Sequence, residues 1–432
     1  MTSKLRIWVG VGAFALVQAG PHLADAVHLK AGGAAWAQEE GEGGEGGEGG
    51  QNEGGEGGEG GEGGGARLSY SLLSTDPAAF AYDAGPALTH HVAHVHASYA
   101  AAAAGAKRLQ QAVDALLAAP SADSLAAARR AWLEARPAYL VTEAFRFYGG
   151  PIDAIEGRIN AWPLNEAFID YVEGQPQAGI VNDPAKALTL EAILDADQVT
   201  DESDVTTGWH AIEFLLWGQD LSADGPGNRP YTDYVAGTTA GDRRRTYLQL
   251  VTGQLVADLD SLAAAWDPAS GAYAAEFRAL PPREALGRVV QGMATLAGFE
   301  FMSERLAVAL DSGDQEDEHS CFSDSTHQDF VYDLKGIADL WSGEGAAGPG
   351  PGIGALVGAR DPKLKAEVDG LLANATAAVA ALGDPWDRVL ATPPGSPERE
   401  AGERAVAALD ALGDGLKKAG NNLGLLIIIP TG

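Results

Sequence analysis

Residues 97–118 read ASYAAAAAGAKRLQQAVDALLA, a run rich in alanine and leucine in which apolar side chains recur at helical spacing. Both residue types are strong helix formers, so the run predicts one long helix over about residues 86–118. The same pattern continues toward the C-terminus, whereas alternating β-branched runs, which would indicate strands, are scarce. We therefore expect an all-α protein, with further helices over about residues 124–147, 207–217, 243–266, 282–310, 363–381 and 398–419.

The number of predicted helices indicates more than one bundle. Seven helices spread over roughly 360 residues are too many for a single four-helix bundle. We therefore predict two four-helix-bundle-like domains packed side by side, an N-terminal one over residues 67–225 and a C-terminal one over residues 226–432. No sequence repeat relates the two halves, so this division rests on size and helix number alone.

The first residues have the pattern of an export signal. Two basic residues precede an apolar stretch over residues 7–17, which is too short to span a bilayer. An A-x-A cleavage site ending at Ala37 predicts a signal peptide over residues 1–37, and a site ending at Ala26 is an earlier alternative. We therefore expect export to the periplasm with removal of this peptide.

Two further stretches belong neither to the signal peptide nor to a predicted helix. Residues 38–66 repeat Glu-Gly-Gly and supply no apolar side chain to bury, so we predict a disordered linker rather than a metal-buffering segment. Residues 423–429 are apolar but too short to cross a bilayer. We therefore predict that the protein is not an integral membrane protein, while association with the membrane surface stays open.

The charge balance excludes one class of partner. The sequence contains 29 basic and 60 acidic residues, a formal net charge of −31. Because binding to phosphate groups needs clustered Lys and Arg, we expect no nucleic-acid partner. An acidic surface suits cations, although acidity of this kind also serves solubility alone. Cys321 is the single cysteine, so no intrachain disulfide can form and packing must stabilise the fold.

Residues 208–220 read GWHAIEFLLWGQD and hold the strongest candidate site. His210 and Glu213 lie three residues apart on a predicted helix, so they can offer an imidazole nitrogen and a carboxylate oxygen to one ion. The apolar residues around the pair predict burial, and a buried carboxylate needs a charge partner or a metal. The alternative is a hydrogen-bonded histidine at a helix interface. The H-E-x-x-H pattern of zinc proteases is absent from this helix.

A second polar pattern can supply the missing ligands from distant sequence. Residues at i, i+4, i+7 and i+11 predict one stripe along a helix, formed by Trp132, Arg136, Tyr139 and Glu143. We predict that Glu143 binds the metal and that Arg136 or Tyr139 orients it. Asp153 can approach from the turn beyond the helix. The alternative is a buried Arg–Glu pair that ties helices together.

Three stretches of the chain resemble the imelysin-like family, in its iron-regulated protein A branch. They are TEAFRFYGGPID at residues 142–153, the G-x-H-x-x-E motif followed by FLLWGQD, and DEHSCFSD at residues 317–324. The resemblance spans most of residues 68–425. It implies two four-helix bundles with the G-x-H-x-x-E site near their interface, in exported bacterial proteins linked to iron.

The periplasmic iron-binding subunits of the Efe-type uptake system are similar around the same motif. That similarity implies a metal site whose ligands are Glu143, Asp153, His210 and Glu213. The position of Asp153 in this set rests on its spacing after the glutamate alone. The residues expected to support the site are Arg136, Tyr139, Arg146 and Gly208.

Two other clusters carry metal-ligating side chains. The first long helix begins with four histidines, of which His90 and His94 have the i, i+4 spacing that suits a divalent ion. No carboxylate accompanies them nearby, so we predict a solvated or interfacial histidine face rather than a second site. The acidic stretch over residues 314–324 lacks the spacing of a calcium loop, and we predict a structural loop near the functional surface.

The sequence thus predicts a periplasmic protein that binds a metal ion for iron uptake or iron sensing. Iron is the expected ion, although one imidazole with carboxylates would also accept zinc, copper or manganese. A membrane iron-transport component is a further expected partner. Whether the protein is an enzyme stays open, because a zinc-dependent metallopeptidase of the imelysin type, with Glu213 or Glu143 as base, is the alternative. A scaffold in which the His–Glu pair only stabilises the bundle interface is a third interpretation.

Overall fold

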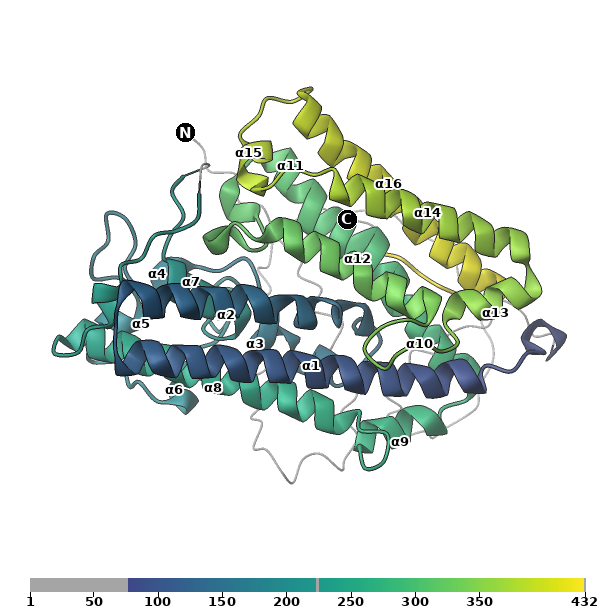
Figure 1. Cartoon of the computed structure of the whole chain (residues 1–432), viewed down its shortest axis with the longest axis horizontal. Helices are drawn as coiled ribbons and strands as arrows, with labels where there is room; N and C mark the ends of the chain where they lie inside the picture. Colours follow the sequence, from purple (N-terminus) through teal and green to yellow (C-terminus); the bar gives the residue numbers. More distant parts are fainter. Residues whose placement is uncertain (1–76, 223–224, 431–432) are drawn as a thin grey trace, which may run out of the picture. The chain divides into compact units, whose positions relative to one another are not determined.

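The computed structural model describes residues 77–222 and 225–430, and most of these residues lie in α-helices (Figure 1). In these ranges no strand forms, and Val172 and Gln175 make an isolated bridge. The all-α prediction is therefore confirmed. The predicted signal peptide and the Glu-Gly linker lie outside the described residues. None of the helices in the described ranges is long and apolar enough to cross a bilayer.

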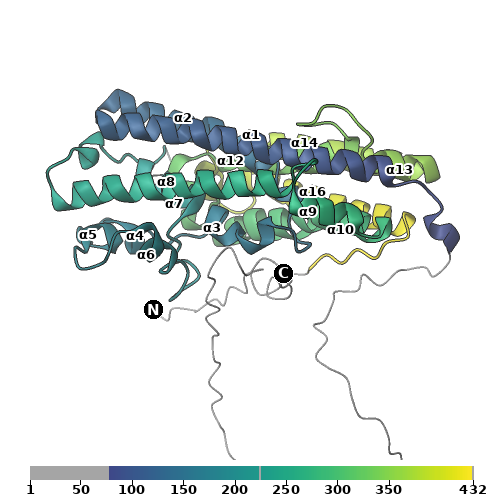
Figure 2. The same cartoon turned by 90° about the horizontal axis from the view of Figure 1, so that it is seen from below.

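Four helices pack together in the first part of the described chain: α1 (Gly85–Ala118), α2 (Ala122–Leu140), α7 (Gly208–Trp217) and α8 (Thr239–Ala265). α1 lies along both α2 and α8, and α7 packs against α2 and α8 (Figures 1 and 2). All ten residues of α7 are buried. The helix that carries the His–Glu motif is therefore covered on every side.

Local sequence explains how α1 and α2 come together. Ser121 caps α2, because its hydroxyl accepts from the N–H of Ser124 and the Ser124 hydroxyl accepts from the N–H of Ser121. Gly105 lets α1 approach α2 closely, since a Cβ at this position would lie 3.1 Å from the Cβ of Ala135. The cap starts the second helix, and the glycine permits the close packing.

The later helices form a second group: α10 (Pro282–Thr295), the π-helical segment η6 (Leu296–Ala307), α12 (Thr326–Ser342), α14 (Pro362–Ala380) and α16 (Pro397–Asn422). α16 packs against α10, η6 and α14, and α12 packs against α14. α12 also packs against α2, so it joins the second group of helices to the first.

Short elements fill the connections. The short helices are α3 (Glu156–Asn160), α4 (Glu166–Ile169), α5 (Gly179–Asn182), α6 (Leu190–Leu194), α9 (Ala272–Ala279), α11 (Val308–Ser312), α13 (Ile353–Arg360) and α15 (Trp386–Leu390). The 3₁₀ turns are η2 (Pro77–Phe80), η3 (Glu143–Phe145), η4 (Ile152–Ala154), η5 (Tyr231–Tyr234), η7 (Gln315–Asp317) and η8 (Cys321–Ser323). The sequence did not predict these elements as separate units, because one or two turns carry too little periodicity.

The end of α2 differs from the prediction. The helix stops at Leu140, about two turns early, because the chain tightens into the 3₁₀ turn η3. The Thr142 hydroxyl donates to the carbonyl oxygen of Tyr139 at 2.6 Å across this change. Glu143 therefore lies beyond α2, and the prediction that it continues the polar stripe of that helix is wrong.

The helix predicted over residues 282–310 consists of α10, η6 and α11 in succession. A π-helix pairs residues five apart rather than four. Accordingly Arg305 and Glu300 of η6 meet, with Nη2 3.0 Å from Oε1. Arg305 thus has one carboxylate partner within its own π-helical segment.

α12 was not predicted from the sequence. Its buried face carries Asp329 and Asp333 among apolar residues. Two buried carboxylates interrupt the apolar periodicity by which a helix is recognised. The division into two bundles near residue 225 stays a prediction. α8 follows that position yet packs against α1 and α7, so helices from both sides of it surround the motif.

Candidate functional site

The G-x-H-x-x-E motif opens α7, and its glycine has a backbone explanation. Gly208 has a φ of 86°, and a Cβ at this position would lie 2.4 Å from the carbonyl oxygen of Ile159. Any other residue would meet that backbone and strain its own. The Thr207 hydroxyl donates to the carbonyl oxygen of Arg158 at 2.9 Å, which holds the start of α7 on the same segment. Gly208 therefore supports the motif through the backbone.

His210 and Glu213 contact each other in the interior of the protein. His210 is 1% exposed and Glu213 is 0% exposed, and Nδ1 of the imidazole lies 3.0 Å from Oε2 of the carboxyl. The other oxygen, Oε1, accepts from the backbone N–H and the hydroxyl of Ser323 at 2.9 and 2.6 Å. Burial raises the pKa of Glu213 to about 8, against the opposing effects of Ser323 and Arg136. Burial, followed by the charge of Arg136, lowers the pKa of His210 well below its usual range.

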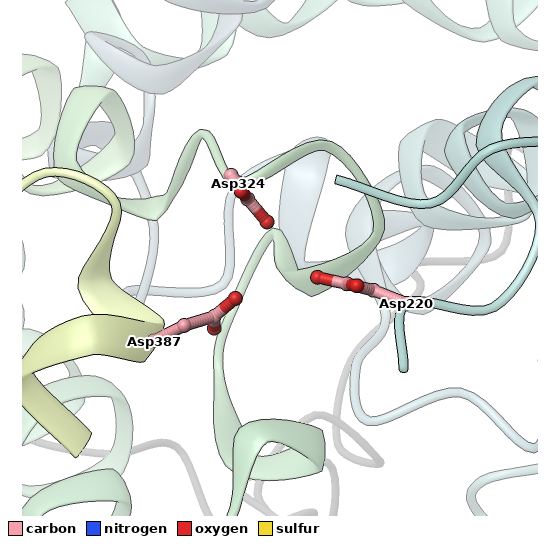
Figure 3. A group of neighbouring side chains, drawn as sticks. All are labelled: Asp220, Asp324 and Asp387. Atoms are coloured by element: carbon pink, nitrogen blue, oxygen red, sulfur yellow. The ribbon is translucent and has the colours of Figure 1, made fainter. Parts of the chain in front are cut away.

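The other two predicted ligands do not join this pair. In the residues that the structure describes, one group of three His, Cys, Asp or Glu side chains has ligand atoms that all lie within 4.8 Å of one another. This group was not predicted, and it consists of Asp220, Asp324 and Asp387 (Figure 3). Glu143 and Asp153 are held in contacts of their own.

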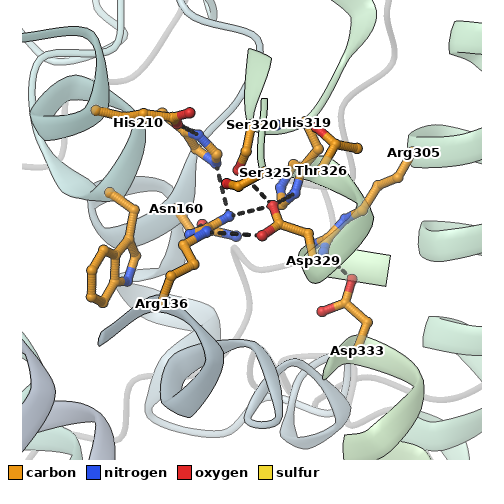
Figure 4. Close-up of polar contacts among 12 residues, drawn as sticks. Arg136, Asn160, His210, Arg305, His319, Ser320, Ser325, Thr326, Asp329 and Asp333 are labelled. Atoms are coloured by element: carbon orange, nitrogen blue, oxygen red, sulfur yellow. Dashed lines mark hydrogen bonds and ion pairs between the residues drawn. The ribbon is translucent and has the colours of Figure 1, made fainter. Parts of the chain in front are cut away.

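Arg136 is the centre of a buried network around the imidazole (Figure 4). Its guanidinium donates to Asp329 from Nε and Nη2 at 3.2 and 3.0 Å, and to Oδ1 of Asn160 at 2.6 Å. Nη2 also lies 3.3 Å from Nε2 of His210. The tautomer that satisfies both imidazole contacts has its proton on Nδ1, which donates to Glu213, while Nε2 accepts from Arg136.

Aromatic rings surround the Arg136 guanidinium. Its central carbon lies 5.5 Å from the ring centroid of Trp132, 6.0 Å from that of Tyr139 and 5.8 Å from that of Trp209. The indole N–H of Trp132 donates to the carbonyl oxygen of Trp209 at 3.1 Å. Tyr139 thus supports Arg136, and through it His210, rather than Glu143.

Residues that the sequence did not identify as ligands complete the network. Nδ1 of His319 lies 2.6 Å from Oδ2 of Asp329, and the Ser320 hydroxyl donates to the same oxygen at 2.6 Å. The rings of His319 and His210 are 4.8 Å apart between centroids. Burial would raise the pKa of Asp329, but Arg136 and His319 hold it well below the usual range. The signal in the sequence was the acidic stretch that contains His319, although nothing in it indicated a contact with Arg136.

Glu143 lies in a second buried cluster, where two guanidiniums compensate its charge. It is 0% exposed, and its Oε2 accepts from Arg146 at 2.6 Å and from Arg305 of η6. Burial would raise the pKa of Glu143, but Arg146 and Arg305 outweigh burial and lower it to about 2. Arg305 also pairs with Asp333 at 2.8 Å. The partners of Glu143 are therefore Arg146 and Arg305, not the predicted Arg136 or Tyr139.

Asp153 serves the turn that follows Glu143. Its two carboxylate oxygens accept four backbone hydrogen bonds of 2.7 to 3.2 Å. The donors are the N–H groups of Phe147, Tyr148, Gly149 and Gly150. Both oxygens of Asp153 thus stabilise the local turn in this structure.

The histidines at the start of α1 lie at helix interfaces. Nε2 of His90 lies 3.0 Å from the carbonyl oxygen of Gly343, and Nδ1 of His96 lies 2.9 Å from that of Ala263. The ring of His91 packs against three aromatic rings. These contacts link α1 to α8 and to the end of α12.

Together the fold and the site define an all-α protein with a buried His–Glu pair and charged networks in its interior. A sequence model of the imelysin family matches residues 95–416, and the chain belongs to this family. Iron-regulated protein A from Synechococcus elongatus is similar, with 26% identity over 323 residues that cover 72% of this chain and 79% of that protein. The resemblance stated from the sequence is therefore confirmed.

Two solved structures share the fold at 18% sequence identity each. One, described as an iron-regulated protein A precursor from Parabacteroides distasonis, has a TM-score of 0.62 and covers 78% of this chain and 95% of its own. The other, an imelysin-like protein from Psychrobacter arcticum, has a TM-score of 0.59 and covers 81% of this chain and 98% of its own. At this level of identity these two structures show the fold alone.

Proposed function

We propose that this imelysin-family protein is exported to the periplasm and binds a metal ion, with iron as the expected ion, at His210 and Glu213. Its role is iron uptake or an iron-responsive function. The name of the Synechococcus elongatus relative supports the choice of iron. The Parabacteroides distasonis protein is a precursor, which together with the signal pattern over residues 1–37 supports export. A membrane iron-transport component is the proposed partner.

The observation that carries the proposal is that the buried carboxyl of Glu213 has no cationic hydrogen-bond partner among the described residues. Its direct hydrogen-bond partners are an imidazole and a serine, and no guanidinium or ammonium group bonds to it among the described residues. A buried carboxylate of this kind gains strongly from a bound cation. Two ligand atoms that share one metal ion at about 2.1 Å and at right angles lie about 3 Å apart, which the 3.0 Å separation from His210 fits.

Arg136 limits where the ion can bind. Its guanidinium lies against Nε2 of His210, and like charges repel strongly in a buried site. The ion therefore belongs between Nδ1 and the carboxyl of Glu213, where it would displace the proton of that carboxyl. The imidazole proton would move from Nδ1 to Nε2, and the Arg136 N–H would turn away from Nε2. Metal uptake should accordingly release protons to the solvent.

Glu143 and Asp153 stay in the proposal as ligands by family similarity. In this structure two arginines hold the first, and four backbone N–H groups hold the second. We therefore expect Glu143→Gln and Asp153→Asn to weaken metal binding less than substitutions at His210 or Glu213.

Calorimetric titration of ferrous iron into chelator-treated protein, without oxygen, tests the proposal. We expect one stoichiometric site in the wild type and none in His210→Ala or Glu213→Gln, with unchanged helical circular dichroism. Glu134→Gln, on the exposed face of α2, is the matched control and should bind as the wild type does. Unchanged binding in both site variants would refute the proposal.

The alternative of a zinc-dependent peptidase gains no support from this geometry. Peptide hydrolysis needs an open metal position next to a substrate cleft. His210 and Glu213 are both buried, so a polypeptide cannot reach them in this conformation. Chelator-sensitive cleavage of an unstructured protein that is lost in Glu213→Gln would restore the alternative.

A further inference from the structure

Three aspartates from distant parts of the chain point toward one another (Figure 3). Asp220 follows the glycine that ends α7, Asp324 follows the 3₁₀ turn η8 with a φ of 55°, and Asp387 lies in the first turn of α15. One carboxylate oxygen of each lies within 4.8 Å of the others. The three segments are brought together by tertiary packing alone.

A fourth carboxylate, that of Glu318, lies next to this cluster of aspartates. Glu318 is 0% exposed, and among the described residues neither of its side-chain oxygens accepts a hydrogen bond of normal geometry. Burial raises the pKa of Glu318 well above its usual range, and the nearby Thr326 hydroxyl offsets only part of this rise. Its charged neighbours are Asp387 and Asp324. One oxygen on each of the three aspartates also has no hydrogen-bond donor in the part of the chain that the structure describes. A carboxylate that is buried without donors is strongly disfavoured unless a proton or a cation binds it.

Two hydrogen bonds to the cluster come from neutral groups. The backbone N–H of Ser222 donates to Asp220 at 3.0 Å, and the Gln315 amide donates to Asp387 at 3.3 Å. Burial raises the pKa of Asp220 to about 6, against the opposing hydrogen bonds of the Ser222 N–H and of Asp324. Burial, followed by the neighbouring acids Asp220 and Asp387, raises the pKa of Asp324 to about 8. Burial and the neighbouring acids thus both disfavour the charged form of Asp324.

We propose that Asp220, Glu318, Asp324 and Asp387 form a binding site for a divalent cation of the calcium type, separate from the His210–Glu213 pair. An all-oxygen set of carboxylates suits hard cations, whereas zinc and copper favour nitrogen or sulfur ligands. Separations of at most 4.8 Å among the aspartate oxygens are compatible with calcium, because two calcium bonds of about 2.4 Å each allow ligand atoms to be that far apart. Magnesium requires a tighter, near-octahedral arrangement.

The cation would connect three structural elements beside the metal-binding pair. Asp220 adjoins the end of α7, and Asp387 belongs to α15. Asp324 directly follows Ser323, whose N–H and hydroxyl hold the carboxyl of Glu213. A bound cation therefore fixes the loop that orients Glu213.

Calcium titration of the chelator-treated full chain tests the proposal by calorimetry and thermal unfolding. We expect one binding event and, at a concentration about a hundredfold above Kd, a rise in Tm of roughly 3–6 °C. Magnesium should bind at least about tenfold more weakly. No heat and no Tm shift in the wild type would overturn the proposal, and equal affinity for magnesium would overturn the choice of calcium.

The variants Asp324→Asn and Asp387→Asn assign the site. Each should weaken calcium binding about tenfold or more and remove the Tm shift, because one of four oxygen donors loses its charge. In chelator each should unfold at or above the wild-type Tm, since repulsion among the acids is relieved; this result also shows that the variants fold. Asp410→Asn, an exposed carboxylate on α16, is the control and should bind as the wild type. Wild-type calcium affinity in both site variants would refute the assignment.

Discussion

Glu143 and Glu213 are both fully buried and were both predicted as metal ligands, yet their surroundings shift the pKa values of the two carboxyls in opposite directions. For Glu143, burial is outweighed by Arg146 and Arg305, and its pKa falls to about 2. For Glu213, burial prevails and its pKa rises to about 8. The fold itself thus stabilises the first as an anion, whereas the second needs a proton or a cation. Depth of burial does not identify a ligand; the charge of the neighbours does.

The largest expected difference between the surroundings of Glu143 and Glu213 is in how much a glutamine substitution changes the free energy of unfolding. Glu143→Gln leaves two buried guanidiniums without their shared anion, and we expect it to lower the free energy of unfolding by about 3 kcal/mol. Glu213→Gln replaces a carboxyl that is protonated at neutral pH, so we expect a change below about 1 kcal/mol in metal-free protein. Urea denaturation of chelator-treated protein at pH 7 measures both values.

The exposed residue Glu134 supplies the control for this comparison. Glu134→Gln should change the free energy of unfolding by less than about 0.5 kcal/mol. Equal losses of unfolding free energy in Glu143→Gln and Glu213→Gln would contradict this prediction, because the two buried carboxyls would then carry the same charge.

The pH dependence of stability sharpens the comparison. Since the pKa of folded Glu143 lies at about 2, below the ordinary 4.5, its contribution is complete above pH 4.5 and is lost as the pH falls toward 2. Since the pKa of folded Glu213 lies at about 8, its contribution is complete below pH 4.5 and is lost as the pH rises to 8. Each slope should be at most about 1.4 kcal/mol per pH unit.

Denaturation of the wild type and the two glutamine variants between pH 3 and 9, in roughly one-unit steps, measures these slopes. The advantage of the wild type over Glu143→Gln should shrink in acid. Relative to Glu213→Gln, the wild type should lose stability from pH 4.5 to 8. If the stability difference between the wild type and each glutamine variant changed with pH in the same direction, the carboxyls of Glu143 and Glu213 would have the same charge state, against this prediction.

The smallest expected effect concerns the serine that holds Glu213. Ser323→Ala removes a 2.6 Å hydroxyl bond but keeps the backbone donor, so we expect a loss of about 1 kcal/mol, larger at pH 9 than at pH 6 because the bond is stronger to the ionised carboxyl. Ser325→Ala is the control, since its hydroxyl contacts that of Ser323 but not Glu213. Urea denaturation at both pH values measures the loss, and a pH-independent loss would argue that Glu213 does not ionise in this range.

Prediction succeeded where structure depends on neighbours in sequence. The helix expected over residues 86–118 is α1 at Gly85–Ala118, and the one expected over residues 363–381 is α14 at Pro362–Ala380. In both, alanine and leucine at helical spacing suffice. The helix α12 was missed because buried aspartates on its inner face, paired with arginines of other segments, obscure the apolar pattern.

The candidate site was predictable only in its local part. His210 and Glu213 meet because residues three apart on a helix share a face. The same reasoning placed Glu143 with Arg136, but the 3₁₀ turn after Leu140 moved it to Arg146 and Arg305.

The sequence by itself determined the all-α class, the imelysin family and the His–Glu pair, since all three depend on residues close together in the chain. Only the tertiary structure decided which buried acids are compensated and which are not. Arg305 reaches Glu143 across 162 positions, and Ser323 reaches Glu213 across 110. The convergence of Asp220, Asp324 and Asp387 has the same origin, because contacts over such separations follow from how whole helices pack.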